Sequence, residues 1–209
     1  MPQKAGMVFL ALLFLLLTAS TPLALAQDDG HFDASLGFAG VFPKQSTGNG
    51  TILNPTNSAA VVASFRYRFN PTHSVEFNYA STRDSQVYTT GANQFRIMSK
   101  LSEYSFAYVL NIFQRGKFEP FLFGGGGALV FHPGNTYINT YALPVFVSKQ
   151  TELAFLYGAG VDYRVVPHVA VRFQYRGLVY KAPDFDGANF LTSAKGNLAE
   201  PSIGVVFRF

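Results

Sequence analysis

The sequence lacks cysteine and tryptophan and carries few charges. The absence of cysteine excludes disulfide scaffolds, cysteine-based zinc sites, iron–sulfur clusters and thiol nucleophiles. Only 13% of the 209 residues are charged, about half the usual share of a soluble domain. The formal net charge of +4 includes no run of like charges, so we expect no nucleic-acid partner.

Aromatic residues and glycine are abundant instead. The chain holds 22 Phe, 11 Tyr and 19 Gly, and 48% of its residues are hydrophobic. A disordered chain is poor in aromatics and rich in charge, so this composition predicts an ordered protein.

The N-terminus is typical of a secretory signal. A positive charge at Lys4 precedes an uncharged apolar stretch over 7–17, and a small-x-small pattern follows at 24–26. We therefore predict a cleaved signal peptide over 1–26 and a mature domain over 27–209.

Beyond this signal, the repeated pattern has a period of two, which is typical of strands with one apolar face. In one example, Val171, Phe173 and Tyr175 alternate with Arg172 and Gln174. Eight segments show this alternation: 32–42, 59–69, 75–79, 104–112, 118–131, 155–163, 171–175 and 203–209. We expect the third and seventh strands to extend past their clearest alternation, to near Tyr88 and Tyr180.

The connections between these segments alternate strictly between short and long. The short ones are 70–73, 114–117 and 165–168, and the long ones are roughly 43–58, 83–97, 132–150 and 182–198. This order predicts an all-β fold, an eight-stranded antiparallel up-and-down transmembrane β-barrel with short periplasmic turns and long extracellular loops.

The composition of the two strand faces indicates which face meets lipid. The apolar face is crowded with rings, whereas the polar face combines a few charges with glycine, alanine and serine. Eight strands enclose room for side chains only, so we expect the polar face to line the lumen. We expect the bulky face to meet lipid, and this face includes Phe121, Phe123, Leu129 and Phe131. The alternative is a lipocalin-like soluble barrel with an apolar interior.

Charged side chains of both signs on the inner face predict a plug of paired charges, because an unpaired buried charge is costly. The predicted lumen polar network consists of Arg66, Arg68, Glu76, Glu103, Asp162, Arg164, Arg172, Arg176 and Arg208.

The sequence resembles the outer-membrane β-barrel family of small, OmpA-like eight-stranded proteins. The resemblance rests on FEPFLFGGGG over 118–127, on YGAGVDYR over 157–164 and on the ending VVFRF. It implies an outer-membrane location and an assembly signal, Phe207 and Phe209, that is read by the barrel assembly machinery. No residues follow Phe209, so we expect no peptidoglycan-binding domain.

We expect no enzyme, and no catalytic, cofactor-binding or metal-binding residues. Eight-stranded lipid A deacylases use a His-x-Ser pair on a strand, and none of the four His is followed by Ser at that spacing. No His or carboxylate cluster has the spacing of metal ligands. An outer-membrane lipid-modifying enzyme is therefore the least favoured function.

Two other functions stay open. The first is a structural or surface-interaction role in contact with outer-membrane lipid, with the lumen plugged and the long loops available to a surface ligand or protein. The second is a carrier or narrow pore for small hydrophobic or anionic solutes. The segment over 136–147 is apolar for an exposed loop, so Tyr137, Tyr141 and Phe146 form a candidate contact surface. Alternatively, this segment extends the neighbouring strands.

Overall fold

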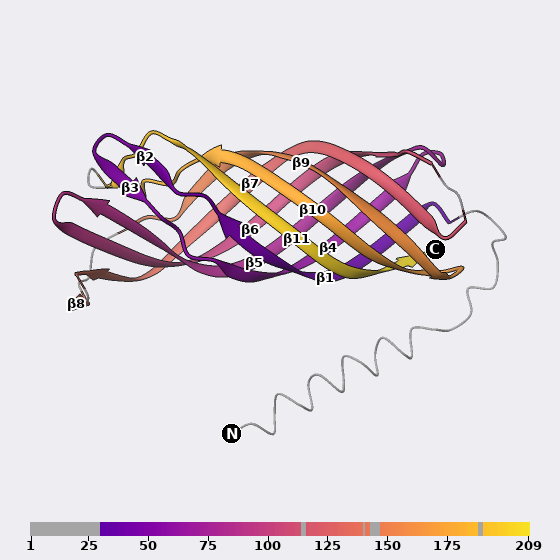
Figure 1. The fold of residues 1–209 in the computed structure, drawn as a ribbon, viewed down its shortest axis with the longest axis horizontal. Helices are drawn as coiled ribbons and strands as arrows, with labels where there is room; N and C mark the ends of the chain where they lie inside the picture. Colours follow the sequence, from indigo (N-terminus) through magenta and orange to yellow (C-terminus); the bar gives the residue numbers. More distant parts are fainter. Residues whose placement is uncertain (1–29, 114–115, 140, 143–146, 188–189) are drawn as a thin grey trace, which may run out of the picture.

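Eight long strands close into a barrel in the computed structural model (Figure 1). The structure describes residues 30–113, 116–139, 141–142, 147–187 and 190–209, so the predicted signal peptide lies outside the described residues. None of the described residues belongs to a helix long and apolar enough to cross a membrane.

Each wall strand pairs antiparallel with the next one along the chain, which confirms the predicted up-and-down order. The wall strands are β1 (Phe32–Pro43), β4 (Ser58–Arg68), β5 (His73–Thr90), β6 (Asn93–Asn111), β7 (Phe118–Ile138), β9 (Gln150–Val166), β10 (Val169–Lys181) and β11 (Lys195–Arg208). Pairing of β1 with β11, from Asp33 opposite Arg208 to Pro43 opposite Leu198, closes the wall.

Alternation along the wall separates an apolar exterior from a polar interior. On β6, the outward Tyr104 and Phe106 are 46% and 63% exposed, while the inward Glu103 and Ser105 are buried. A lipocalin-like barrel would have the opposite polarity, so that alternative is wrong. The exposed rings instead form the lipid-facing band of a membrane barrel.

Strand β7 is an exception, and its predicted orientation is wrong. Phe121, Phe123, Leu129 and Phe131 are all buried in the lumen rather than facing lipid. The reason lies on the neighbouring strand β9, where Gly160 pairs with Phe121 and Gly158 pairs with Phe123. A side chain at either glycine would overlap the paired ring, so the rings fill the volume that the glycines leave.

The wall also extends further than predicted at the loop end. The predicted extension of two strands to near Tyr88 and Tyr180 is confirmed by β5 and β10. The predicted long loop over 83–97 is wrong, because β5 and β6 continue as one hairpin to a turn at Gly91 and Ala92. Gly91 has a φ of 59°, in the left-handed region that glycine adopts at little cost.

Three short strands add to this extension: β2 (Ser46–Gly48), β3 (Thr51–Leu53) and β8 (Tyr141–Ala142). Strand β3 pairs with the outer end of β5, and β8 pairs with the end of β7 at Tyr137 and Ile138. The first part of the 136–147 segment is thus strand, as the extension alternative predicted.

We predict that Gly158→Val lowers the free energy of unfolding by about 1–3 kcal/mol, the usual effect of overpacking. The added side chain would overlap Phe123 and the carbonyl oxygen of Tyr175. The matched control is Gly126→Ala on the outer face, where a Cβ meets only the Ala154 carbonyl oxygen at 3.5 Å. Heat-modifiable gel mobility across a urea series measures both midpoints, and equal midpoints would contradict the packing argument.

Candidate functional site

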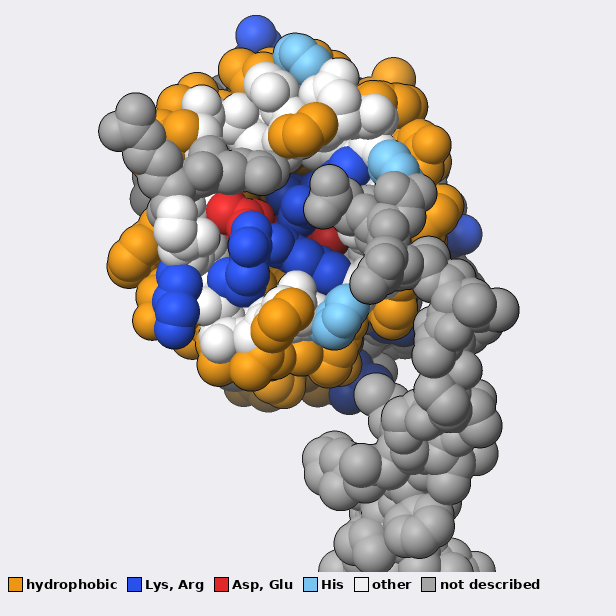
Figure 2. Space-filling view, turned by 90° about the vertical axis from the view of Figure 1, so that its right-hand side faces the viewer, with side chains coloured by type: hydrophobic (Ala, Val, Ile, Leu, Met, Phe, Trp, Pro, Cys, Tyr) orange, Lys and Arg blue, Asp and Glu red, His pale blue; other side chains and the backbone are white. Residues whose placement is uncertain are grey.

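The lumen at the short-turn end is filled with charged side chains. Figure 2 views this end and shows basic and acidic groups at the centre of a hydrophobic ring. All nine residues of the predicted network face the lumen, where their side chains form ion pairs at three successive levels. Arg164, at 38%, has the most exposed side chain of the nine.

The first level, nearest the short turns, gathers around two carboxylates. Arg208 donates two hydrogen bonds to Glu119, of 2.9 Å from Nη1 and 2.6 Å from Nη2. Arg164 also donates to Glu119, and Arg68 donates to Asp33 at 2.7 Å. The two-pronged Arg208 contact is the strong form of this interaction, because it fixes both geometry and charge.

The second level spans the width of the lumen. Arg172 holds Asp162 of the adjacent strand β9 through bonds of 2.7 and 2.9 Å. Its Nη1 also donates to Glu76 of β5, on another part of the wall, at 2.8 Å. Glu76 in turn accepts a 2.8 Å bond from Nε of Arg66. One guanidinium therefore links two sides of the barrel.

An aromatic ring completes this level. The guanidinium carbons of Arg66 and Arg172 lie 4.4 and 5.1 Å from the centre of the Phe121 ring. Both distances are within the range of a cation–π contact. The inward orientation of Phe121, which the sequence analysis did not predict, thus stabilises the charges it lies beside.

The third level consists of Arg176 with Glu103 and Glu200. Arg176 donates to Glu103, and its Nη2 lies 3.4 Å from Glu200. Ser105 donates a further 2.7 Å bond to Glu103. All three charged side chains are buried.

Sequence reasoning missed three carboxylates of this network: Asp33, Glu119 and Glu200. Asp33 and Glu200 lie in the alternation of the inner face, Glu200 two residues before Ser202, so the periodicity contained their signal. Glu119 was hidden by the wrong orientation of β7, since it shares a face with Phe121. With these three, the ion pairs join six arginines to six carboxylates, a balanced set.

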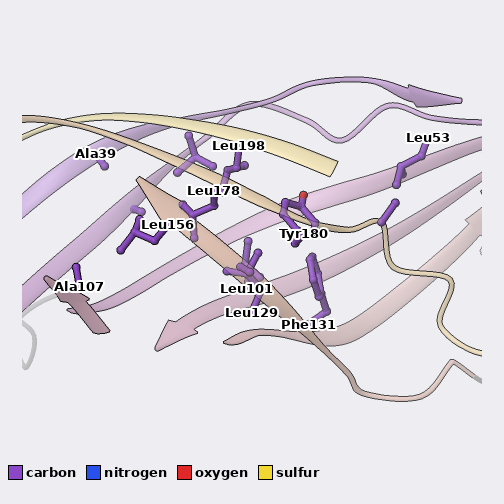
Figure 3. Packing of buried hydrophobic residues seen from close by; sticks show 14 of the residues in the cluster. Ala39, Leu53, Leu101, Ala107, Leu129, Phe131, Leu156, Leu178, Tyr180 and Leu198 are labelled. Atoms are coloured by element: carbon purple, nitrogen blue, oxygen red, sulfur yellow. The ribbon is translucent and has the colours of Figure 1, made fainter. Parts of the chain in front are cut away.

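The outer half of the lumen contains a large apolar cluster, which the sequence analysis did not predict, beside a polar group in which Asp84 accepts hydrogen bonds from Ser99 and Gln86. Figure 3 shows leucines from several strands converging with Phe131 and Tyr180. The fully buried leucines of this cluster are Leu53, Leu129, Leu156, Leu178 and Leu198.

The segment after β10 covers this apolar half. Phe185 and Phe190 are buried in it, and Tyr88 donates a 2.7 Å hydrogen bond to the carbonyl oxygen of Pro183. The side-chain oxygen of Gln150 accepts bonds from the backbone amides of Asp184 and Phe185, at 2.9 and 2.6 Å. These contacts hold the segment inside the barrel mouth.

Comparison with known proteins identifies the family. The sequence model of one family, the outer membrane protein beta-barrel domain, matches residues 9–209. The chain belongs to this family. Among curated proteins, none matches the sequence.

Several solved structures of small outer-membrane barrels have the same fold as this chain. OprG from Pseudomonas aeruginosa is 16% identical, with a TM-score of 0.58, over 86% of this chain and 96% of its own. Neisserial surface protein A is 18% identical, with a TM-score of 0.53, over 86% and 97%. AlkL, whose structure was determined in lipid bilayers, is 14% identical, with a TM-score of 0.52, over 88% and 92%. At these identities the likeness concerns the fold, and the family places the protein in the outer membrane.

The remaining predicted residues lie on the outer surface of the barrel or at its loop end. Phe207 and Phe209 face outward, 40% and 66% exposed, and their role as an assembly signal stays a prediction. Tyr141 is 77% exposed and Tyr137 is partly buried, whereas Phe146 lies outside the described residues. The contact-surface hypothesis therefore depends on Tyr141 among the residues the structure describes.

We predict that Arg172→Met destabilises the barrel by about 3–5 kcal/mol, because the buried Glu76 and Asp162 each lose one of their positively charged partners. Arg172 donates hydrogen bonds to both Glu76 and Asp162. The control is Lys117→Met in an exposed turn, with an expected change within about 0.5 kcal/mol. Urea midpoints of refolded barrels provide the measurement, and a midpoint for Arg172→Met equal to that of the control would refute a stabilising network.

Proposed function

We propose that the protein is a closed outer-membrane barrel with a structural or surface-interaction role. The observation that carries this proposal is that two different kinds of side-chain packing fill the lumen. Ion pairs occupy the half near the short turns, and mainly apolar side chains occupy the half near the loops. A solute would have to displace both.

The space left inside the lumen supports a closed state. One cavity, of about 10 Å³, borders Glu103 and Glu200, and another, of about 20 Å³, borders Arg172 and Gln174. Each has room for about one water molecule. A conducting path would require the separation of charges that are now paired at hydrogen-bond distance, at a cost that rises in a narrow interior of low dielectric.

The loop end supports a role at the cell surface. The β5–β6 hairpin and the β2–β3 hairpin continue the wall beyond the length that a membrane requires. Their backbone hydrogen bonds hold these extensions in a defined shape, which favours recognition by a surface ligand or protein over a purely flexible tether.

The proposal includes no catalytic step. The charged side chains of the three levels form ion pairs with one another, and the cavities beside them are smaller than a substrate. Catalysis requires a reacting group held next to a substrate, in a pocket that excludes water.

A second candidate function, a carrier of small hydrophobic molecules, is favoured by the apolar half of the lumen. Movement of the segment that contains Phe185 and Phe190 would open this apolar volume to the outside. The described contacts of the segment are with Gln150, Tyr88, Phe95 and Phe131 rather than with the ion pairs, so its release would leave the charged levels intact.

The closed barrel predicts no steady current in a planar bilayer. The refolded protein is first shown to be folded by heat-modifiable gel mobility, and a porin in the same bilayer serves as a positive control. Stable open-channel currents from the folded protein would overturn the closed lumen and would favour the narrow pore.

The carrier predicts saturable binding of an apolar fluorescent probe, strengthened several-fold by Phe185→Ala, which removes a ring from the apolar lumen. The matched control is Phe173→Ala on the lipid-facing side, which is 50% exposed. Binding that is absent from both the wild-type protein and Phe185→Ala would leave the structural role as the favoured function.

A further inference from the structure

The outer face of β7 carries a strip with almost no side chains. Gly124, Gly126 and Ala128 point outward in succession, and a Cβ at Gly126 would meet only one carbonyl oxygen, at 3.5 Å. At Gly124 the nearest atom, again a carbonyl oxygen, is 3.9 Å away. The strip is therefore open to the lipid.

Large side chains border the strip on both sides, in register with it. On β6, Tyr108, Phe106 and Tyr104 pair with the three strip positions. On β9, Tyr157, Phe155 and Leu153 pair with the same positions. All six bordering side chains are at least 37% exposed, and the two rows lie about 10 Å apart, twice the spacing between strands. The result is a shallow apolar groove the width of one acyl chain.

A row of basic side chains lies beyond the outer end of the groove. Arg83 of β5 pairs with Lys100 of β6, and Lys100 pairs with His132 of β7. All three are exposed and lie on the outer face. Neither Arg83 nor Lys100 forms an ion pair with any residue that the structure describes. The neighbouring Asp84 is turned the other way, where it accepts hydrogen bonds from Ser99 and Gln86.

The position of this row matches the membrane surface. Strand β5 begins at the short-turn end with His73, and Arg83 lies about ten residues further along it. A tilted strand needs about 9–11 residues to cross the hydrocarbon. The basic row therefore lies at the level of the outer-leaflet headgroups, and the groove lies in the hydrocarbon just below it.

We propose that this face of the barrel binds one phosphorylated, multiply acylated lipid of the outer leaflet. Arg83 and Lys100 hold the phosphate, with His132 beside them, and one acyl chain lies in the groove over Gly124, Gly126 and Ala128. Charge complementarity selects this occupant, since guanidinium and ammonium groups at headgroup level attract phosphate. The rings that border the groove provide its apolar contacts.

The test measures binding of bisphosphorylated lipid A to the refolded full chain in neutral detergent, by native mass spectrometry. We expect Arg83→Gln with Lys100→Gln to weaken binding about tenfold or more. The matched control is Lys44→Gln with Lys195→Gln, which removes the same charge from exposed positions away from the groove and leaves binding unchanged. Heat-modifiable mobility verifies that each variant is folded.

A second pair of measurements separates the two parts of the site. Gly126→Leu fills the groove and should weaken lipid A binding several-fold, whereas Gly126→Ala should have a small effect. Lipid A stripped of its phosphates should bind the wild-type protein as weakly as it binds the Arg83 and Lys100 double variant. The proposal would be overturned if the control pair, Lys44→Gln with Lys195→Gln, weakened lipid A binding as much as Arg83→Gln with Lys100→Gln. A dimer of barrels that Gly126→Leu dissociates would also overturn it and would assign the groove to a second copy.

Discussion

The structure depends on the requirement that every backbone amide and carbonyl in hydrocarbon has a hydrogen-bond partner. A sheet meets this requirement only when its first and last strands pair, and here β11 returns to β1. Closure with eight strands leaves an interior no wider than the side chains that fill it. The other features of the protein, from the glycines of β9 to the balance of lumenal charge, follow from this narrow interior.

A narrow interior admits charge only as neutral combinations. The six arginines and six carboxylates meet this condition at three levels, and the contact between Arg172 and Glu76 extends it across the lumen. Toward the loops the lumen is filled mainly by leucine and aromatic side chains, and the polar groups among them, such as Tyr88 and Asp84, have hydrogen-bond partners. The two halves solve one packing problem by different chemistry, and the two cavities described above each have room for about one water molecule.

Periodicity predicted the wall because one strand face meets lipid and the other meets the lumen, a difference that recurs every second residue. It was insufficient for β7, where large apolar residues face inward and glycine faces outward. On that strand the volume left at Gly158 and Gly160 decides the orientation, and this volume depends on a register that the sequence of β7 alone does not contain. The missing Glu119 is a direct consequence.

The same limit applied at the loop end. Residues 83–97 are polar and lack the apolar alternation of the membrane segments, so they were predicted as a loop. Their strands are held instead by pairing with each other and with β3, and by inward residues such as Tyr88 and Ile97. Beyond the lipid, strands no longer need an outward apolar face. The alternation of hydropathy therefore no longer identifies them in the sequence.

The contacts that cross the lumen have a consequence for the order of folding. Arg172 and Glu76 are 96 positions apart, and Arg208 and Glu119 are 89 apart, so these pairs form only after the two halves of the chain have curved toward each other. Until the seam closes, the inner face of the open sheet needs water to solvate its charges. The final stage of assembly is therefore a dehydration. The pairing of β1 with β11 and the pairing of the lumenal arginines with their carboxylates occur as a single event.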